Sequence, residues 1–404
     1  MSIPKQLEYR VKTLLNCMWP AMPNRKEAEM KVTIGKKEFL KGISKVLGIT
    51  GRKTNIQITS TVLIRALEDK VSLLATDLET GFEGKYSADV IEEGEIAVNA
   101  RKLFEIIKDF PSDEIFIYEV ENRWITIEAD KSKTKAEFHI VGMDPEEFPE
   151  FPKFDHVDSF EINSGILKEM IEKCLITGVS EDNRLHLAGL LLERFEEDEN
   201  KIIRMVCTDG HRLIKIDRLF SQENNFQTGD PVIIPKKGMS EIVKLLDSDE
   251  ITQIGFHDNN LIVKHREEMI FIRLLEGDYP DYREVIPQVG DFFMKVPKST
   301  FLGLLKRMSI LSSDRYNGVV FNLNQERLET SATNPEIGDS KEDISVEYNG
   351  EALEMAFNPR YFIESLNVIK SDSVIIKILD FEHPFILEGE DDPFFMTVIM
   401  PMKI

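Results

Sequence analysis

A segment that reads as a helix followed by a strand occurs three times in this chain, and it constrains the fold more than any other feature. The copies span residues 99–115 (NARKLFEIIKDFPSDEI), 235–251 (PKKGMSEIVKLLDSDEI) and 358–374 (NPRYFIESLNVIKSDSV). Each begins on Asn or Pro, has a basic residue within its first three positions, and repeats apolar residues at helical spacing before a Ser-Asp pair. This pattern predicts a helix that ends shortly before a β-strand.

A second set of amphipathic helices follows the same period. Its members are predicted at residues 36–47, 164–175 and 298–311, and each precedes one copy of the first set. Both sets recur roughly every 130 residues, far longer than the roughly 20–50 residues of a solenoid repeat. The sequence therefore predicts three divergent copies of one two-helix domain, each with its own core.

The repeat divides the chain of 404 residues, of which 42% are hydrophobic, into three domains. We predict these domains at residues 30–154, 155–288 and 289–404, with alternating strands around each pair of helices. Residues 1–29 stand outside the repeat. This extension is interpreted either as a disordered or non-native segment before Met30, or as a tail that binds a partner.

The charge of the chain is distributed unevenly. Acidic residues outnumber basic ones by 72 to 50, and the net charge of −22 argues against a nucleic-acid partner. The six predicted helices nevertheless contain more Lys and Arg than Asp and Glu, so the remainder of the chain is more acidic still. A solvated Lys-rich face is common on one amphipathic helix, but the same bias on six repeat-related helices favours a shared basic surface.

The cysteines give no sign of a disulfide framework or a metal site. Cys17, Cys174 and Cys207 form no Cys-x-x-Cys pair and are odd in number. We expect no cofactor and no metal. No apolar run approaches the roughly 20 residues that span a bilayer, and the first residues lack a continuous signal-peptide core. These features favour a protein of the cytoplasm with no membrane partner.

Two shorter stretches carry expectations of their own. Residues 336–343 are polar and acidic and are predicted to form a loop that interrupts the strands of the third domain. The chain ends on FFMTVIMPMKI, for which we predict a strand up to Ile399 and a surface from Met400 onward.

The pair Asp209 and His211 is the strongest candidate for catalysis. Asp209-Gly210 suits a tight turn, and His211 beside a carboxylate invites an acid–base role. No nucleophile and no metal-ligand spacing accompanies the pair. A structural or binding role is therefore favoured, and an enzyme acting on an acidic or phosphorylated substrate remains the alternative from another functional class.

Several motifs, in this order and at these spacings, resemble one family. They are CTDGHRL, IPKKGMSEIVKLL, GDYPDYREVIP, the Thr-Asn-Pro-Glu of residues 333–336, and the ending VIMPMKI. Over residues 30–404 the chain resembles the bacterial DNA polymerase III beta subunit, the sliding clamp. Residues 1–29 have no counterpart in that family.

The resemblance implies a fold and a function. It implies an α+β fold of three repeated DNA-clamp domains, each with two inner helices and outer antiparallel sheets, in a ring formed head to tail by two identical subunits. The ring would encircle duplex DNA without reading its sequence and tether the replicative polymerase, which gives processivity without any catalytic activity. Its partners would be DNA, the polymerase III catalytic subunit, the clamp loader, and repair proteins that carry similar peptide motifs. A regulatory paralogue that forms the ring without serving the main polymerase remains a further alternative.

The resemblance also implies three sets of site residues. The DNA-binding set lies on inner helices or a nearby loop and comprises Arg52, Arg101, Lys102, Lys168, Lys236, Lys237, Lys298, Lys306, Arg307 and Arg360. The peptide-binding groove lies between the second and third domains and comprises Arg184, His186, Leu187, Thr208, Gly210, His211, Arg212, Leu213, Pro280, Val285, Pro384, Val398, Met400, Pro401 and Met402. The dimer interface places Ile310 and Leu311 of one subunit against Phe138 and Ile140 of the other.

The groove departs from the usual pattern of the family in a few places. Leu185 and His186 stand where aromatic residues are frequent, Glu284 lies beside a pocket position, and Glu382 replaces a residue that is more often apolar. These departures leave the peptide preference of the groove open.

Overall fold

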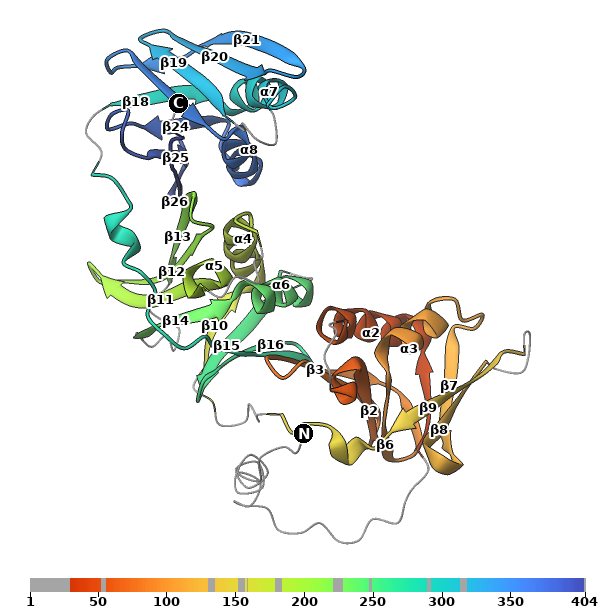
Figure 1. The fold of residues 1–404 in the computed structure, drawn as a ribbon. Coiled ribbons are helices and arrows are strands. Elements are labelled where there is room, and N and C mark those ends of the chain that lie inside the picture. The colour runs from red at the N-terminus through yellow and green to blue at the C-terminus, as the bar shows by residue number, and fades with distance from the viewer. Residues whose placement is uncertain are drawn as a thin grey trace, which may run out of the picture.

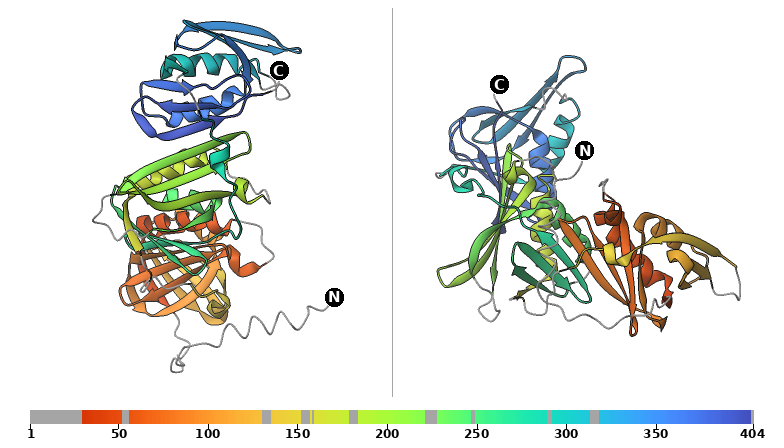
Figure 2. Two further views of the ribbon diagram at one scale, coloured as in Figure 1. Left: turned by 90° about the vertical axis from the view of Figure 1, so that its left-hand side faces the viewer. Right: turned by 60° about the horizontal axis from the view of Figure 1, so that its bottom comes forward.

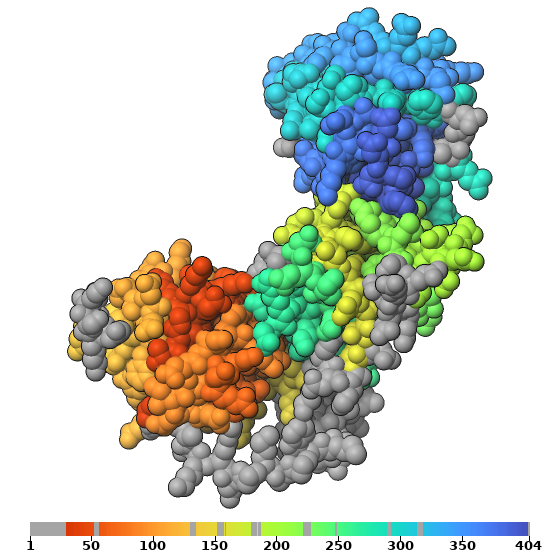
Figure 3. Space-filling model, turned by 180° about the vertical axis from the view of Figure 1, so that it is seen from behind, coloured from red at the N-terminus to blue at the C-terminus, as the bar shows by residue number. Residues whose placement is uncertain are grey.

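The computed structural model describes residues 30–51, 56–129, 135–151, 157, 159–178, 184–220, 228–246, 249–288, 292–312 and 318–402. Three similar units follow one another along an arc, with their long helices on its concave side and their sheets outside (Figure 1). The space-filling view from behind shows the second unit between the other two (Figure 3). The predicted threefold repeat is confirmed.

The first unit contains two long helices and nine strands. Its helices are α2 (Lys36–Thr50) and α3 (Ala100–Lys108), which pack against each other. Its strands are β1 (Lys31–Gly35), β2 (Thr61–Leu67), β3 (Lys70–Thr76), β4 (Thr80–Ser87), β5 (Asp89–Glu92), β6 (Gly94–Asn99), β7 (Glu114–Val120), β8 (Trp124–Ala129) and β9 (Glu137–Met143).

The second unit follows a similar order, with one short additional helix and, among the described residues, one strand fewer. Its helices are α4 (Ser164–Leu175), α5 (Leu185–Ala188) and α6 (Lys236–Leu245). Its strands are β10 (Ser159–Asn163), β11 (Gly189–Glu197), β12 (Asn200–Thr208), β13 (Arg212–Phe220), β14 (Gly229–Pro235), β15 (Ile251–His257), β16 (Asn260–His265) and β17 (Glu268–Arg273).

The third unit has the same two-helix plan. Its helices are α7 (Lys298–Met308) and α8 (Pro359–Val368). Its strands are β18 (Phe293–Pro297), β19 (Val319–Asn324), β20 (Arg327–Asn334), β21 (Gly338–Ser345), β22 (Glu347–Tyr348), β23 (Leu353–Phe357), β24 (Ser373–Lys377), β25 (Phe385–Gly389) and β26 (Asp392–Ile399).

The helix-to-strand segments of the three units accept similar hydrogen bonds. The first residue of α2, α4 and α7 donates its backbone N–H to a carbonyl just after the second helix of the unit, at 2.7–2.8 Å. The acceptors are Asp113 and Asp372, each the Asp of a Ser-Asp pair, and Glu250, which directly follows the pair in the second unit. Each pair of helices is therefore joined in the same way, and apolar residues of both helices enter the core.

One sequence prediction in the third unit is wrong. Residues 336–343 were expected to form a loop, but β21 occupies most of this stretch and pairs antiparallel with β20 from Asn334↔Gly338 to Arg327↔Ser345. Apart from Ile344 the strand is polar, which its place at the edge of the sheet permits. It therefore lacks the apolar alternation by which strands are recognised. The terminal strand β26 ends at Ile399, as predicted.

The sheets do not stop at the boundaries between units. Within the described residues, a 13-stranded sheet joins the first and second units where β4 pairs with β17, and a nine-stranded sheet joins the second and third where β13 pairs with β26. The remaining sheet has four strands in the order β21-β20-β19-β23. Figure 2 shows the units stacked in chain order. Neighbouring units are joined by a pair of strands as well as by the connecting chain.

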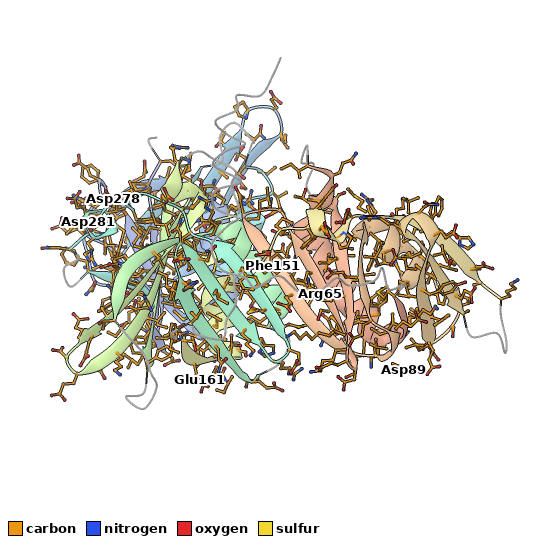
Figure 4. All side chains as sticks on the ribbon, turned by 90° about the horizontal axis from the view of Figure 1, so that it is seen from below. Arg65, Asp89, Phe151, Glu161, Asp278 and Asp281 are labelled. Atoms are coloured by element: carbon orange, nitrogen blue, oxygen red, sulfur yellow. The ribbon has the colours of Figure 1, made fainter. Side chains whose placement is uncertain are left out.

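Side chains reinforce both junctions. Lys45 of α2 forms an ion pair with Glu268 of β17, and Lys173 of α4 forms one with Asp392 of β26 at 2.6 Å. Phe151, labelled near the first junction in Figure 4, lies 5.3 Å from Phe271 between ring centroids. Lys45 and Lys173 occupy the same position in the first helix of their units, so the two junctions are related by the repeat.

Candidate DNA-facing helices and partner groove

The concave side of the arc carries exposed cations on three helices. Arg101 and Lys102 on α3 are exposed and both bond Glu105, and the hydrogen bond from Lys102 lowers the pKa of that carboxyl. On α7, Lys306 is exposed, and Arg307 bonds the carboxylate of Glu342 on β21. These pairs lie in solvent, where an ion pair contributes little and exchanges readily for a phosphate.

The other predicted cations differ in accessibility. Arg360 on α8 has a side chain 76% exposed and bonds Glu364, whereas Lys168 and Lys237 are half-buried. Lys298 is half-buried as well, and its Nζ donates to the carbonyl oxygen of Ile369 at 2.7 Å. Arg52 lies outside the described residues.

Lys236 corrects the sequence prediction. It is only 1% exposed, and its Nζ donates to the carbonyl oxygen of Thr208 at 2.8 Å, so it faces the interior of the second unit rather than DNA. Burial lowers its pKa. The equivalent positions in the other two copies, Ala100 and Pro359, are buried as well. Comparison of the three copies could have identified this position as an inward-facing one.

Acidic side chains lie on the outer strands and on the connection between the second and third units. Figure 4 labels Asp89, Glu161, Asp278 and Asp281 at the periphery of the molecule, and all four are exposed. The charge segregation inferred from the sequence is thus seen in part: exposed cations lie on the helices, whereas exposed carboxylates lie outside together with cations such as Arg65, Lys85 and Lys341. Duplex DNA would be attracted to the concave side and repelled elsewhere.

The turn between β12 and β13, at residues 208–211, is fixed by several hydrogen bonds. Asp209 accepts the backbone N–H groups of His211 and Arg212 on one oxygen, each at 3.0 Å, while Gly210 takes a positive φ of 87°. Thr208 donates its hydroxyl to the carbonyl oxygen of Arg212 at 2.7 Å. The backbone N–H of Met400 bonds His211, so the end of β26 is attached to this turn.

In this geometry Asp209 and His211 are not paired as the acid and base that the enzyme alternative requires. The second oxygen of Asp209 accepts a hydrogen bond from Nε of Arg212 at 3.0 Å, so both carboxylate oxygens are used to fix the turn. The ring of His211 stacks on Tyr361 of the third unit, with an angle of 13° between the planes. Among the described residues, no cluster of three or more potential metal ligands occurs.

The residues predicted for the groove differ in accessibility. Exposed members are Arg184, Gly210, His211, Pro280, Val285, Met400 and Met402, and Thr208 and Pro401 are half-buried. Buried members are Leu187, Leu213, Pro384 and Val398. The side chain of His186 lies outside the described part of the chain. Leu213 and Val398 belong to one buried apolar cluster with Tyr282, and the exposed Val285 and Met400 follow Tyr282 and Val398 closely in the chain.

Arg212 departs from its predicted place in the groove wall. Its side chain is 4% exposed and is directed toward the third unit, where it bonds the carboxylate of Glu364 and lies 4.9 Å from the ring centroid of Tyr361. Arg212 therefore positions the turn at residues 208–211, and its charge is paired within the protein instead of being available to a ligand.

Three sheet-linked two-helix units, with basic helices inside and acidic sheets outside, define a DNA clamp. The models of the N-terminal, central and C-terminal domains of the DNA polymerase III beta subunit match residues 30–152, 161–281 and 283–403. The chain belongs to the DNA polymerase III beta subunit family. It is a DNA sliding clamp of replication and not an enzyme, and its partners as a clamp are DNA, the polymerase and the clamp loader.

Individual relatives match along nearly the whole chain. The beta sliding clamp of Pseudomonas putida is 30% identical over 381 residues, covering 93% of this chain and 100% of the relative, and that of Vibrio cholerae is 28% identical over 384 residues with the same coverage. The crystal structure of the Pseudomonas aeruginosa DNA polymerase III subunit beta, 30% identical, superimposes with a TM-score of 0.83, and the Bacillus subtilis sliding clamp, 27% identical, with 0.85. Both structures cover 93% of this chain and are themselves covered completely.

Among the helices of the described ranges, none combines the length and apolar composition that a membrane crossing requires.

Proposed function

We propose that two copies of this chain close head to tail into a ring around duplex DNA, which would tether the replicative polymerase and give processivity. The single observation that carries this proposal is the recurrence of one strand pairing at both junctions within the chain. In each, the fourth strand of one unit pairs with the last strand of the next: β4 with β17, and β13 with β26.

The same rule names the strands that would meet between subunits. The fourth strand of the third unit is β21, an edge strand of its sheet within the described residues. The last strand of the first unit is β9, which pairs with β8 along its length but with β6 only through Met143 and Gly142. A partner's β9 added to β21 would extend the sheet as at the two internal junctions, which is a heterologous contact that closes by rotation.

The register at the internal junctions transfers to this seam. Ile272 lies opposite Thr80 and Ile399 opposite Arg212, and the bridges of Met143, Leu275 and Met402 align the last strands of the three units. Thr80 and Arg212 are the first residues of β4 and β13, and Gly338 is the first residue of β21. The transferred register therefore sets Ile140 opposite the partner's Gly338, next to Ile337.

The apolar surface supports this seam. Ile337 is 68% exposed and Ile310 is 73% exposed, and Phe138 is also exposed. The resemblance implied Phe138, Ile140, Ile310 and Leu311 for the interface. Ile337 was missed, and its apolar side chain within the polar stretch 336–343 was the available signal. Single exposed apolar residues are common, but exposed apolar residues at both of the proposed edges are what this contact would need.

The inner helices would hold DNA without reading it. We keep Arg101, Lys102, Lys168, Lys237, Lys298, Lys306, Arg307 and Arg360 as proposed phosphate contacts, together with Arg52. Contacts to phosphates are independent of sequence and weaken with salt, so a shift along the duplex exchanges equivalent contacts. The ring can slide, and its retention comes from topology.

The groove between the second and third units would take peptides from the polymerase, the clamp loader and repair proteins. Exposed Val285, Met400 and Met402 above a buried apolar layer suit Leu or Phe anchors, and the polar groups of the turn at residues 208–211 suit the rim. The units that frame it are proposed to span residues 30–154, 155–288 and 289–404.

Retention on DNA tests the ring. The clamp is loaded by a clamp loader onto circular DNA, and the salt is then raised until phosphate contacts are screened. We expect the protein to stay on the closed circle and to leave once the circle is cut. Equal loss from circular and linear DNA would refute topological attachment.

A further inference from the structure

The carboxylate of Glu364 on α8 is shared by two arginines that belong to different proposed sites. One is Arg212, which follows the groove turn and also donates to the carbonyl oxygen of Ile176 at the end of α4. Its guanidinium contacts Tyr361 of α8 through the ring face and through the carbonyl oxygen, at 3.4 Å. Arg212 thereby fastens the turn of the second unit to the helix of the third.

The other arginine is Arg360, on the side of the DNA. Its Nε donates to the remaining oxygen of Glu364 at 2.6 Å, and its side chain is otherwise exposed. The next residue, Tyr361, stacks on the ring of His211. The first turn of α8 therefore carries a proposed phosphate contact and the anchor of the groove at the same time.

We propose that Glu364 couples the groove to the DNA bore, so that DNA against Arg360 tightens the binding of a peptide partner. This inference rests on the proposed function of both sites. A phosphate competes with Glu364 for Arg360, because both are anions within reach of one exposed guanidinium. Once Arg360 binds the phosphate, Glu364 pairs with Arg212 alone. The turn at residues 208–211, which Arg212 follows, is then held more firmly. A turn that is already fixed loses less freedom when a peptide binds.

The coupling is reciprocal by linkage, so a bound peptide also strengthens the contact between Arg360 and DNA. A polymerase attached to the groove would then hold a clamp that is on DNA more tightly than a free one. The relevant charges are those of Arg212, Arg360, Asp209 and Glu364.

The first unit supplies a matched comparison. Arg101 and Glu105 repeat the spacing and helix position of Arg360 and Glu364, and they form the same ion pair. The residue that would face Glu105 as Arg212 faces Glu364 is the first residue of β21 in the partner copy, Gly338, which carries no cation. Glu105 thus pairs with Arg101, which is proposed to face DNA, and has no counterpart of the groove residue Arg212.

Fluorescence anisotropy of a short labelled peptide with Leu and Phe anchors tests the coupling, using the full chain with and without a short linear duplex at low salt. The variants are R360A, E364Q and their combination, with E105Q as the control, and a second label on the duplex shows that it is bound. In the wild type we expect the duplex to tighten peptide binding about twofold, the scale of an exposed ion pair. R360A should reproduce this gain without DNA, because it also leaves Glu364 to Arg212.

E364Q should weaken peptide binding about tenfold, since it removes a charge-assisted bond to a buried guanidinium. It should also abolish the response to both the duplex and R360A, whereas E105Q should keep the wild-type affinity and response. A duplex effect that persists in E364Q, or an R360A variant with wild-type affinity, would overturn the coupling. If the wild type binds no peptide, the proposed groove falls and the coupling with it. If peptide and duplex both bind and neither affects the other, only the coupling falls.

Discussion

Lys236 and Lys237 are neighbours in the sequence, and the fold gives them different surroundings. Lys236 lies at the buried second position of its helix segment, and Lys237 lies at the position of the exposed Arg101 and Arg360. A pattern of adjacent lysines cannot separate the two, because helix phase is set by the core that the helix meets. The buried ammonium retains one bond, to the carbonyl oxygen of Thr208.

The first prediction concerns this buried charge. K236M keeps the length of the side chain and removes the cost of a desolvated ammonium, so we expect its free energy of unfolding to stay within about 1 kcal/mol of the wild type. K236A leaves a cavity and should cost about 2–4 kcal/mol. Urea unfolding measures both. The salt dependence of DNA binding should be unchanged in K236M, and a clear change there would return Lys236 to the DNA-facing set.

A second prediction follows from Glu169, which lies on α4 close to the second junction. Burial raises its pKa, but hydrogen bonds from Lys173 and Lys370 outweigh burial and lower the pKa to about 2 from an ordinary value of 4.5. Because folding lowers this pKa, the stabilisation that the ionised carboxylate contributes is complete above pH 4.5. It is lost as the pH falls toward 2. The difference in free energy of unfolding between wild type and E169Q should therefore shrink over this range, from at most about 3 kcal/mol. A difference independent of pH would contradict the ion-pair account.

At the scale of elements, the helices were the most predictable part of the fold. Their apolar residues recur at three- and four-residue spacing because one stripe of each enters the core. The first residues of these helices could also be predicted, because Asn is a preferred residue just before a helix. Asn99, Asn163 and Asn358 each accept a backbone N–H of the first turn. Strand β21 was not predictable in this way, because a polar edge strand owes its structure to pairing with β20 rather than to its own pattern.

The third prediction addresses these helix starts. N358A removes the side-chain acceptor for the N–H of Arg360, and we expect it to lower the stability of the third unit by about 1 kcal/mol. N358D keeps an acceptor at the same place and should remain close to the wild type. Thermal unfolding followed by circular dichroism compares the two. Equal losses would mean that the cap has no energetic role.

At the scale of the whole molecule, the sequence indicated three domains and a basic inner surface, but it could not give the strand pairing that links the domains. Pairing across a junction joins residues far apart in the chain, such as Phe82 and Ile270, and no local pattern records the partner. The same holds for Arg212, whose contacts to Glu364 and Tyr361 depend on how two units meet. The resemblance placed Arg212 at the groove, and only the structure shows its orientation.

The fourth prediction concerns the proposed seam. Replacing both Ile310 and Leu311 with Asp should give monomers by light scattering, because two charges would be buried against the partner's first unit. I337D should weaken the dimer in the same direction. L219D, which alters a similarly exposed apolar residue of the second unit, is the control and should remain dimeric. A dimer that survives the first two changes would rule this seam out.

The strand pairs at the junctions have one more consequence, which concerns geometry. A protomer with a donor strand edge at one end and a matching acceptor edge at the other is a polymerising unit, since nothing in the edges themselves limits the number of copies. Only the curvature of the arc determines whether the second copy returns to the first or continues as a filament. That curvature is set at the β4–β17 and β13–β26 pairs. Substitutions there, far from the free ends, would decide between a closed assembly and a fibre.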